Sequence, residues 1–237
     1  MIDMFRYLKR WLPGKDEISK PKTSAKQGLE MLRREYAGKP LLEEKVNKDP
    51  IRQFSEWFDE AVEKIKTDPN AMILATAEPD GKPSSRTVLL KGFNELGFVF
   101  YTNYGSRKAR QILSNPNVSI TFYWPELMRQ VHVEGKTEKV SARQSDDYFA
   151  TRPPSSRLSA WASSQSEPVA SREELEDKLS EMEKKFTDDS IPRPPNWGGF
   201  RIKPCRIEFW QGRLNRLHDR ICYIKKEKEW KIKRLSP

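Results

Sequence analysis

Histidine and cysteine are scarce in this sequence, and their scarcity excludes several kinds of site. The 237 residues include two histidines and two cysteines, Cys205 and Cys222, with no CxxC pair. No cluster therefore has the ligand spacing of a zinc site. We interpret the cysteines as reduced thiols, although the sequence leaves a disulfide between them open. With so few histidines, an enzyme of this sequence is expected to take its reactivity from a cofactor.

Long apolar runs and several common motifs are also absent. No segment approaches the about 20 apolar residues that a membrane-spanning helix needs. Residues 1–15 are basic and aromatic and lack the apolar region of a secretory signal. We therefore expect a cytoplasmic protein in which residues 1–26 form a flexible extension; a short amphipathic helix on a membrane surface is the alternative. The sequence has no GxxxxGK[ST], GxGxxG or GxSxG motif, so neither a glycine cradle for phosphate nor a serine nucleophile is supported.

Positive charge is in excess. The sequence has 44 lysines and arginines against 34 aspartates and glutamates, a formal net charge of +10. Such an excess attracts nucleic acid, anionic lipid or phosphorylated small molecules. Several cations fall at the ends of expected strands and helices, where guanidinium, ammonium and backbone amide groups can bind phosphate. Each of them is, taken singly, equally compatible with an ordinary surface role. These cations are Arg86, Lys91, Arg107, Lys108, Arg152, Arg216 and Arg220.

Strand patterns occur in consecutive runs, with helices inserted between them. Asp49 and Pro50 are typical of the N-cap and first residue of a helix, and Ser171 with Glu174 predicts a capping box at the start of another. Residues 141–163 are expected to be helical in two pieces, broken at Pro153-Pro154, and residues 130–134 alternate as a half-exposed strand should. We expect a mainly β protein with helices (α+β), built as an antiparallel barrel or sheet, with one domain over residues 27–237. The expected strands lie within residues 71–93, 97–103, 117–124, 129–140, 198–212, 220–226 and 229–235.

Six separated motifs carry a resemblance to a known family. They are SSRTVLLKGF, FYTNYGSRKA, FYW followed by RQVHVEG, YFATRPPSS, ASSQS and FWQGRLNRLHDR. In this order and spacing they resemble the pyridoxine/pyridoxamine 5'-phosphate oxidases, from about residue 33 to residue 237. The resemblance implies an FMN-binding split β-barrel that forms a homodimer, with FMN between the subunits. It implies no nucleic-acid or membrane partner.

The reaction implied by the resemblance belongs to vitamin B6 cofactor synthesis or salvage. Pyridoxine 5'-phosphate or pyridoxamine 5'-phosphate would be oxidised to pyridoxal 5'-phosphate, with a hydride passing to flavin N5. O2 would be the final acceptor and would give H2O2. Arg216 and His218 would be the catalytic residues, and whether His218 takes a proton or only positions the substrate is left open.

The resemblance also implies two sets of binding residues. Within the cofactor set, Gln165 and Ser166 would reach FMN from the partner chain. The cofactor set is Arg86, Thr87, Val88, Leu89, Tyr101, Thr102, Arg107, Lys108, Gln130, Gln165, Ser166, Trp210 and Arg220. The substrate set is Lys91, Tyr148, Arg152, Ser156, Arg216, Leu217, His218, Arg33 and Tyr36.

Some residues depart from the family pattern. Arg157 and Ser159 stand where the family usually has glutamine and glycine, so Arg157 either alters the substrate mouth or faces solvent. His132 is interpreted as a half-exposed strand residue.

Two other functions are compatible with the sequence. A nucleic-acid-binding protein would use the positive charge and the aromatic residues on strands. A non-catalytic flavin or B6-phosphate carrier would share the same barrel, but would have little need for Arg216 and His218.

Overall fold

The computed structural model describes residues 32, 34–187 and 190–237. The chain divides into two units, Met1–Glu35 and Tyr36–Pro237, and the second holds every element described below. The extension expected over residues 1–26 and the substrate role expected for Arg33 lie outside the described residues. Within the described part of the chain, no helix is both long and apolar enough to cross a membrane.

A single antiparallel sheet dominates the unit Tyr36–Pro237. The order of its strands is β2-β1-β5-β6-β7-β4-β3, and β8 and β9 continue the sheet from β7. These strands are β1 (Ala71–Ala77), β2 (Pro83–Leu89), β3 (Gly92–Asn94), β4 (Gly97–Asn103), β5 (Asn117–Trp124), β6 (Arg129–Lys139), β7 (Trp197–Gln211), β8 (Asp219–Lys226) and β9 (Glu229–Arg234). The expectation of an antiparallel, mainly β fold with inserted helices is confirmed.

The long strand β7 gives the sheet its curvature. Its first half pairs with β4 along one edge, and its second half pairs with β8 along the same edge. On the other edge β7 pairs with β6 over nearly its whole length, with a register shift between Glu134 and Gly135. A β-bulge bends a strand and increases its twist. The strands β6 and β7 can therefore belong to two parts of the sheet that are inclined differently.

Five helices flank the sheet in the described residues, and local signals fix their ends. They are α1 (Pro50–Lys64), α2 (Arg107–Ser114), α3 (Ala142–Ala150), α4 (Pro154–Ala162) and α5 (Arg172–Lys185). The Asp49 carboxylate accepts a hydrogen bond from Ile51 N at 2.8 Å, as expected of an N-cap. Ser171 likewise caps α5, although the Glu174 carboxylate accepts from Ala170 N and not from the cap residue itself. The break between α3 and α4 falls at Pro153, where the sequence predicts it.

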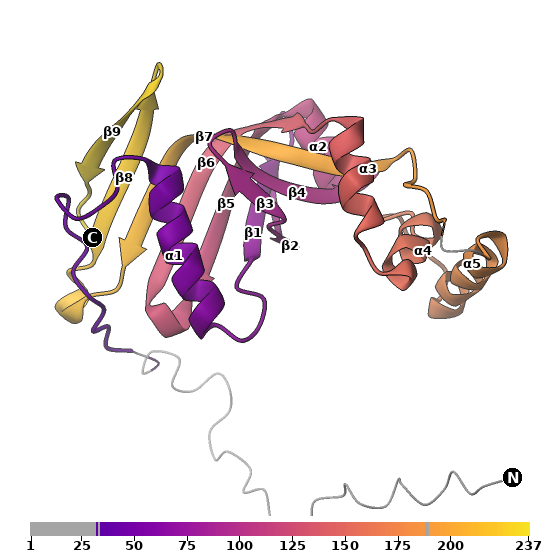
Figure 1. Ribbon diagram of the computed structural model, residues 1–237, viewed down its shortest axis with the longest axis horizontal. Coiled ribbons are helices and arrows are strands. Elements are labelled where there is room, and N and C mark those ends of the chain that lie inside the picture. The colour runs from indigo at the N-terminus through magenta and orange to yellow at the C-terminus, as the bar shows by residue number, and fades with distance from the viewer. Residues whose placement is uncertain (1–31, 33, 188–189) are drawn as a thin grey trace, which may run out of the picture. The chain divides into compact units, whose positions relative to one another are not determined.

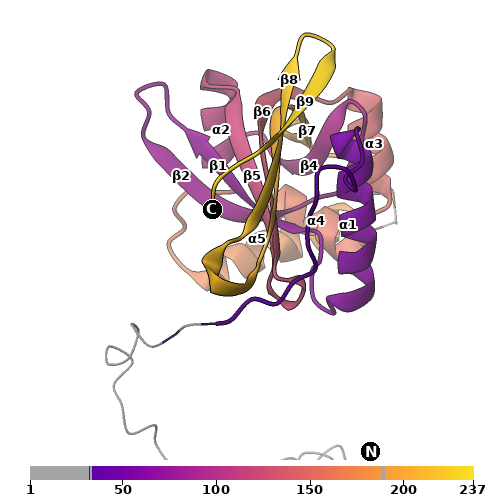
Figure 2. The ribbon, with the colours of Figure 1, turned by 90° about the vertical axis from the view of Figure 1, so that its left-hand side faces the viewer.

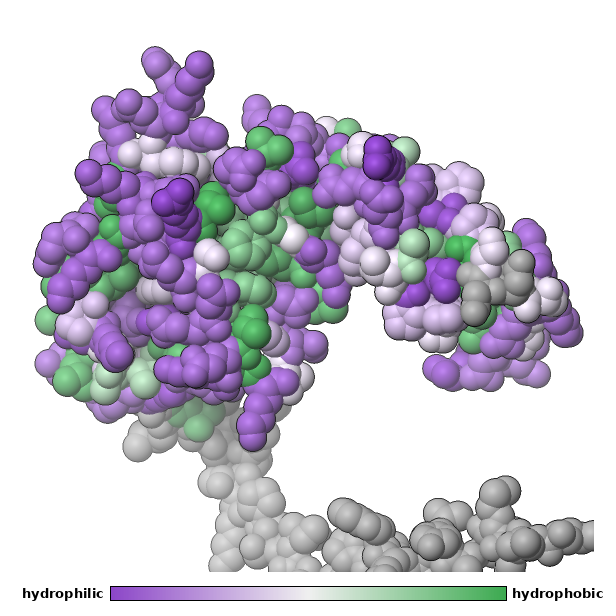
Figure 3. Space-filling model, in the orientation of Figure 1, coloured by the Kyte–Doolittle hydropathy of each residue, from purple (hydrophilic) through white to green (hydrophobic). Residues whose placement is uncertain are grey.

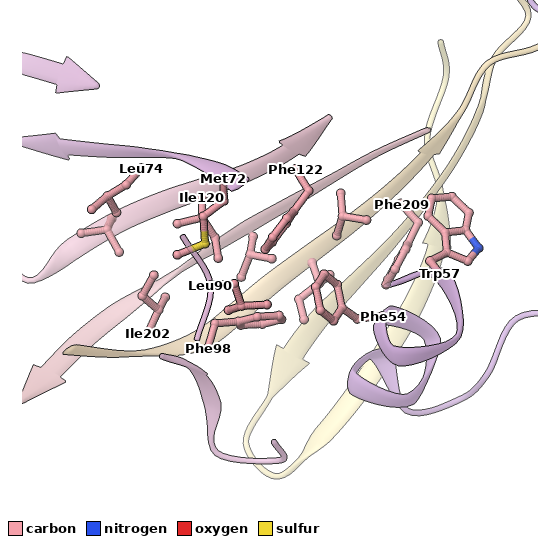
Figure 4. Close-up of a cluster of buried hydrophobic side chains, with 14 of the residues drawn as sticks. Phe54, Trp57, Met72, Leu74, Leu90, Phe98, Ile120, Phe122, Ile202 and Phe209 are labelled. Carbon is pink, nitrogen blue, oxygen red and sulfur yellow. The ribbon is translucent and has the colours of Figure 1, made fainter. Parts of the chain in front are cut away.

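The hydrophobic core lies between α1 and the curved sheet (Figure 1 and Figure 2). Phe54 on α1 has no exposed surface and meets the rings of Phe93 and Phe98 edge-on, each at 4.9 Å between centroids. Figure 4 shows Phe54 and Trp57 directed toward side chains of the strands. The face of the molecule in Figure 3 is mainly hydrophilic, with apolar side chains confined to smaller patches. This core fixes the strands whose ends carry the candidate site.

Candidate functional site

A polar pocket of about 740 Å³ opens where β2 and β4 meet α2, α3 and α4. Twelve of the residues expected from the sequence line it: Arg86, Thr87, Val88, Leu89, Lys91, Tyr101, Thr102, Lys108, Tyr148, Arg152, Ser156 and Gln165. They come from five separate stretches of the chain. Their convergence is produced by the fold, because β7 pairs with β4 and also packs against α3, the helix that precedes α4.

Arg86 lines this pocket and is held by a network from three elements. Its guanidinium donates to Leu74 O at 3.2 Å and to the hydroxyls of Thr76 and Ser84 at 2.6 Å each. The buried Gln111 on α2 accepts from both hydroxyls, at 2.6 and 2.7 Å. Burial, with a smaller effect of the Arg107 charge, lowers the pKa of Arg86, so this cation would gain from a bound anion.

Lys108 is a second cation in the wall of this pocket. Its ammonium donates to Gln165 Oε1 at 2.8 Å and to Thr102 Oγ1 at 3.3 Å. Burial, together with the Arg86 charge, lowers the pKa of Lys108 to about 8. Within the described residues, no carboxylate contributes to the pKa shift of Arg86 or of Lys108. Two neighbouring cations of this kind are a typical arrangement for binding a phosphate.

Another part of the pocket wall is aromatic and also carries a cation. Tyr148 stacks on Tyr101 with centroids 3.9 Å apart and planes at 11°. The Arg152 guanidinium lies over the Trp197 ring at 4.8 Å. Its Nη1 atom is buried and has no hydrogen-bond partner among the described residues, and burial lowers the pKa of Arg152. A buried guanidinium nitrogen without a partner is costly, which indicates a place for a ligand oxygen.

A second group of expected residues lies at the β7–β8 turn and does not line this pocket. Trp210 and His218 have ring centroids 4.6 Å apart, and Tyr36 meets both rings edge-on at 5.6 and 5.4 Å. Burial and the charge of Arg216 lower the pKa of His218. Asn215 and Arg216 both have positive φ, 55° and 60°. Such left-handed backbone in consecutive non-glycine residues is uncommon and is typical of functional turns.

Arg220 joins this second group through a buried carboxylate. Its Nε donates to Glu208 Oε1 at 2.7 Å, and its Nη1 donates to Ser236 O at 2.8 Å. Glu208 also binds Arg206 Nη2 at 2.7 Å, and its side chain is 7% exposed. Burial by itself raises the pKa of Glu208, but the hydrogen bond and charge of Arg220, with Arg206, lower it below its usual range. Arg220 is therefore held in place before any ligand binds.

Comparison with known proteins assigns the family. A family model described as pyridoxamine 5'-phosphate oxidase matches residues 58–186. A second, described as the pyridoxine 5'-phosphate oxidase C-terminal dimerisation region, matches residues 197–237. A protein of Rubrobacter xylanophilus named pyridoxine/pyridoxamine 5'-phosphate oxidase is 59% identical over 213 residues, which cover 90% of this chain and 98% of that protein. The chain belongs to the pyridoxine/pyridoxamine 5'-phosphate oxidase family.

Further relatives agree with this family assignment. A protein of the same name from Acaryochloris marina is 51% identical over 206 residues, which cover 87% of this chain and 94% of that protein. The crystal structure of PhzG from Burkholderia lata, in complex with tetrahydrophenazine-1-carboxylic acid, has a TM-score of 0.79 at 28% identity, covering 85% of this chain and 100% of that one. An FMN-binding protein of Nostoc punctiforme shares the fold, with a TM-score of 0.65 at 20% identity, covering 81% and 100%. The expected split β-barrel is confirmed.

The family's expected site residues thus fall into two groups in one chain. Arg107 is exposed at the start of α2 beside the pocket, and Gln130 on β6 pairs with Trp210 in the second group. Ser166 follows Gln165 and has a positive φ of 75°. Gln165 was expected from the partner chain, yet its hydrogen bonds to Thr102 and Lys108 lie within this chain.

Sequence reasoning did not single out some residues of the site, and it left the role of others open. Gln111 binds the two hydroxyls that hold Arg86. The only feature of the sequence that could have identified Gln111 is its place, as a polar residue, on the inner side of a short amphipathic helix. Arg157 lines a different pocket of about 330 Å³ with Asp146 and Arg193, so it does not enter the pocket of about 740 Å³. His132 lies on β6 and hydrogen-bonds Thr121 Oγ1 at 2.9 Å, as a strand residue. Other lining residues not singled out are Asn103, Thr151, Pro153 and Trp197.

Proposed function

We propose that this chain is an FMN-dependent oxidase that converts pyridoxine 5'-phosphate and pyridoxamine 5'-phosphate into pyridoxal 5'-phosphate. The observation that carries the proposal is the pocket of about 740 Å³, whose wall holds the two cations Arg86 and Lys108 and also the buried, unsatisfied Nη1 of Arg152. Two phosphorylated ligands, a cofactor and a substrate, would account for these two sets of cationic groups. The family assignment and the names of the relatives support this choice of ligands.

The residues present fit FMN. Arg86 and Lys108 would hold its phosphate, because both are partly desolvated cations whose pKa values are lowered in the absence of an anion. Arg107 would add charge at the start of α2, where the helix dipole also favours an anion. The remaining cofactor contacts would come from Thr87, Val88, Leu89, Tyr101, Thr102, Gln130, Gln165, Ser166, Trp210 and Arg220.

The part of the pocket at Arg152 fits the phosphate of a B6 vitamer. Arg152 would turn its unpartnered Nη1 to a phosphate oxygen, which removes the cost of leaving a buried donor unsatisfied. Lys91, Tyr148 and Ser156 line the same pocket and would supply an ammonium and two hydroxyls. Arg152 is already placed by its contact with Trp197, so little side-chain entropy would be lost on binding.

A second copy of the chain would complete the site. The β8–β9 hairpin and helices α3 and α4 lie toward opposite ends of the sheet in Figure 1, and the second group does not line the pocket. That group, with Trp210, Arg216, Leu217, His218 and Arg220, falls within residues 197–237, which match the dimerisation region of the family. We propose a homodimer in which Arg216 and His218 of one chain face the pocket of the other, and Tyr36 covers the ligand.

The protein's own contribution to the reaction would be orientation and electrostatics. FMN, when bound, supplies the two-electron acceptor for the hydride from the substrate's 4'-carbon and passes the electrons to O2. Arg152 and Lys91 would fix the substrate by its phosphate, which sets the distance of the 4'-carbon from the flavin. Arg216 and His218 would hold the pyridine ring, and the surrounding cations would stabilise developing negative charge. The walls of aromatic residues would limit the access of water.

A product assay tests this function. The purified protein, supplied with FMN and either vitamer in air, is expected to form pyridoxal 5'-phosphate and H2O2 in equal amounts. Arg152→Met should raise the KM for both vitamers by about tenfold or more, because a charge-assisted contact to phosphate is lost. Formation of neither product by FMN-loaded protein would leave the non-catalytic carrier as the better description.

A further inference from the structure

The hydrogen bond between Arg213 and His218 assigns a protonation state. The backbone N–H of Arg213 donates to His218 Nδ1 at 3.1 Å. A backbone amide is only a donor, so Nδ1 must present its lone pair. The neutral imidazole then carries its proton on Nε2, because the hydrogen bond made by one ring nitrogen fixes the state of the other.

The Arg213 side chain is fixed by a carboxylate, Asp219. Arg213 Nε lies 3.3 Å from Asp219 Oδ2, and Arg213 Nη1 donates to Gly38 O. The same carboxylate accepts from Leu41 N at 3.0 Å and from Arg234 Nη1 at 2.7 Å. Asp219 thus ties the β7–β8 turn to residues 38–41 and to the end of β9. Arg213 lies in the same turn as Arg216, yet its side-chain contacts are with Asp219 and Gly38 and leave no sign of an anion-binding role.

Two glycines let the segment 36–41 lie close against the turn. Gly38 N donates to Gly212 O at 3.1 Å. A Cβ at Gly212 would lie 2.5 Å from Cδ1 of Tyr36, and one at Gly38 would overlap the Gln211 side chain. This approach places the Tyr36 ring against Trp210 and His218. The imidazole is therefore held by the Arg213 amide at Nδ1 and by aromatic rings beside it.

We propose that Arg213 and Asp219 are positioning residues that keep His218 as a neutral Nε2–H donor, so that His218 donates a hydrogen bond to an oxygen of the substrate and does not take its proton. The substrate part rests on the proposed function, whereas the tautomer does not. Protonation at Nδ1 would set an N–H of the ring against the N–H of Arg213, and Nε2 already carries a proton. The charge of the neighbouring Arg216 disfavours the imidazolium further.

Nitrogen NMR of the FMN-loaded full chain shows directly which ring nitrogen of His218 is protonated. The chain has two histidines, so a long-range ¹H–¹⁵N spectrum contains two imidazole patterns, and His132→Gln identifies which belongs to His218. At pH 8 we expect Nδ1 of His218 at the position of an unprotonated nitrogen and Nε2 at that of a protonated one. A protonated Nδ1, or two nitrogens averaged by exchange, would overturn the proposal.

Two variants test the positioning residues. Asp219→Asn weakens the acceptor of three donors, and Arg213→Ala keeps the amide but loses the contacts to Asp219 and Gly38. In each, the two His218 nitrogen signals are expected to move toward the exchange average, and substrate affinity is expected to fall about tenfold. Asp177→Asn, on the exposed part of α5, is the matched control and should change neither.

The outcomes separate this proposal from the proposed function. Unchanged His218 signals in both folded variants would refute the positioning role of Arg213 and Asp219. A fixed Nε2–H tautomer in a protein that binds neither vitamer would instead refute the proposed substrate and leave the assignment of the ring in place.

Discussion

The lowered pKa of Lys108 makes FMN affinity depend on pH in a defined way. Without ligand, burial and the Arg86 charge lower the pKa of Lys108 to about 8. A bound phosphate would restore the ammonium, so the pKa in the complex lies higher. Below about pH 7 the Lys108 ammonium is present in both states, so Lys108 contributes no dependence of FMN affinity on pH. Above pH 8 the free protein loses the proton that the complex keeps, and affinity falls as pH rises.

The size of this effect follows from proton linkage. Between the two pKa values the apparent Kd rises about tenfold per pH unit, so the Kd for FMN at pH 9 should be about tenfold that at pH 7. Quenching of flavin fluorescence during titration of the apoprotein measures it. Riboflavin, which lacks the phosphate, should show no such dependence on pH.

Two variants make the assignment specific to Lys108. Lys108→Met should bind FMN weakly at every pH, because the methionine side chain carries no charge. Lys108→Arg should bind FMN with an affinity that does not change up to pH 9. A flat profile in the unmodified protein would refute the reasoning. So would a Lys108→Met protein that keeps the tenfold change, since the titrating group would then lie elsewhere.

Three further predictions concern the core and the second group of residues. Phe54→Ala removes a fully buried ring that meets several aromatic neighbours, and should lower the free energy of unfolding by about 3–5 kcal/mol in a urea titration. Glu208→Gln loses the carboxylate shared by Arg206 and Arg220, and should weaken FMN binding about tenfold in the same fluorescence assay; unchanged affinity would argue against a role for Arg220 at the cofactor. Arg216→Leu should reduce kcat/KM far more than FMN affinity, and an equal loss of both would contradict its placement at the substrate ring.

The sequence predicted those features that depend on local chemistry. The N-cap at Asp49, the proline break before α4 and the alternation along β6 are each set by a few neighbouring residues. Order along the chain also indicated an antiparallel sheet, because strands in consecutive runs favour hairpin pairing. The family motifs placed twelve residues that line one pocket.

Other features depend on tertiary packing and were not accessible from sequence. Gln111 supports Arg86 because α2 packs on β1, a contact with no local signal. The separation of Trp210 from the pocket follows from the pairing of β7 with both β4 and β8. Arg157 stood next to a substrate motif, yet the turn of α4 directs it into a different pocket. The contacts of Asp219 with Leu41 and Arg234 join segments far apart in the chain and also had no local signal.

The visible absorption spectrum of the purified protein tests the central claim most directly. The protein, loaded with FMN and kept anaerobic, is mixed with pyridoxine 5'-phosphate and then exposed to air. We predict that the flavin bands bleach on addition of the vitamer and return with oxygen, which would establish cofactor, substrate and oxidant together. Flavin bands that stay unchanged when the vitamer is added would contradict the proposed oxidase activity, and a protein that binds no FMN would contradict the cofactor site as well.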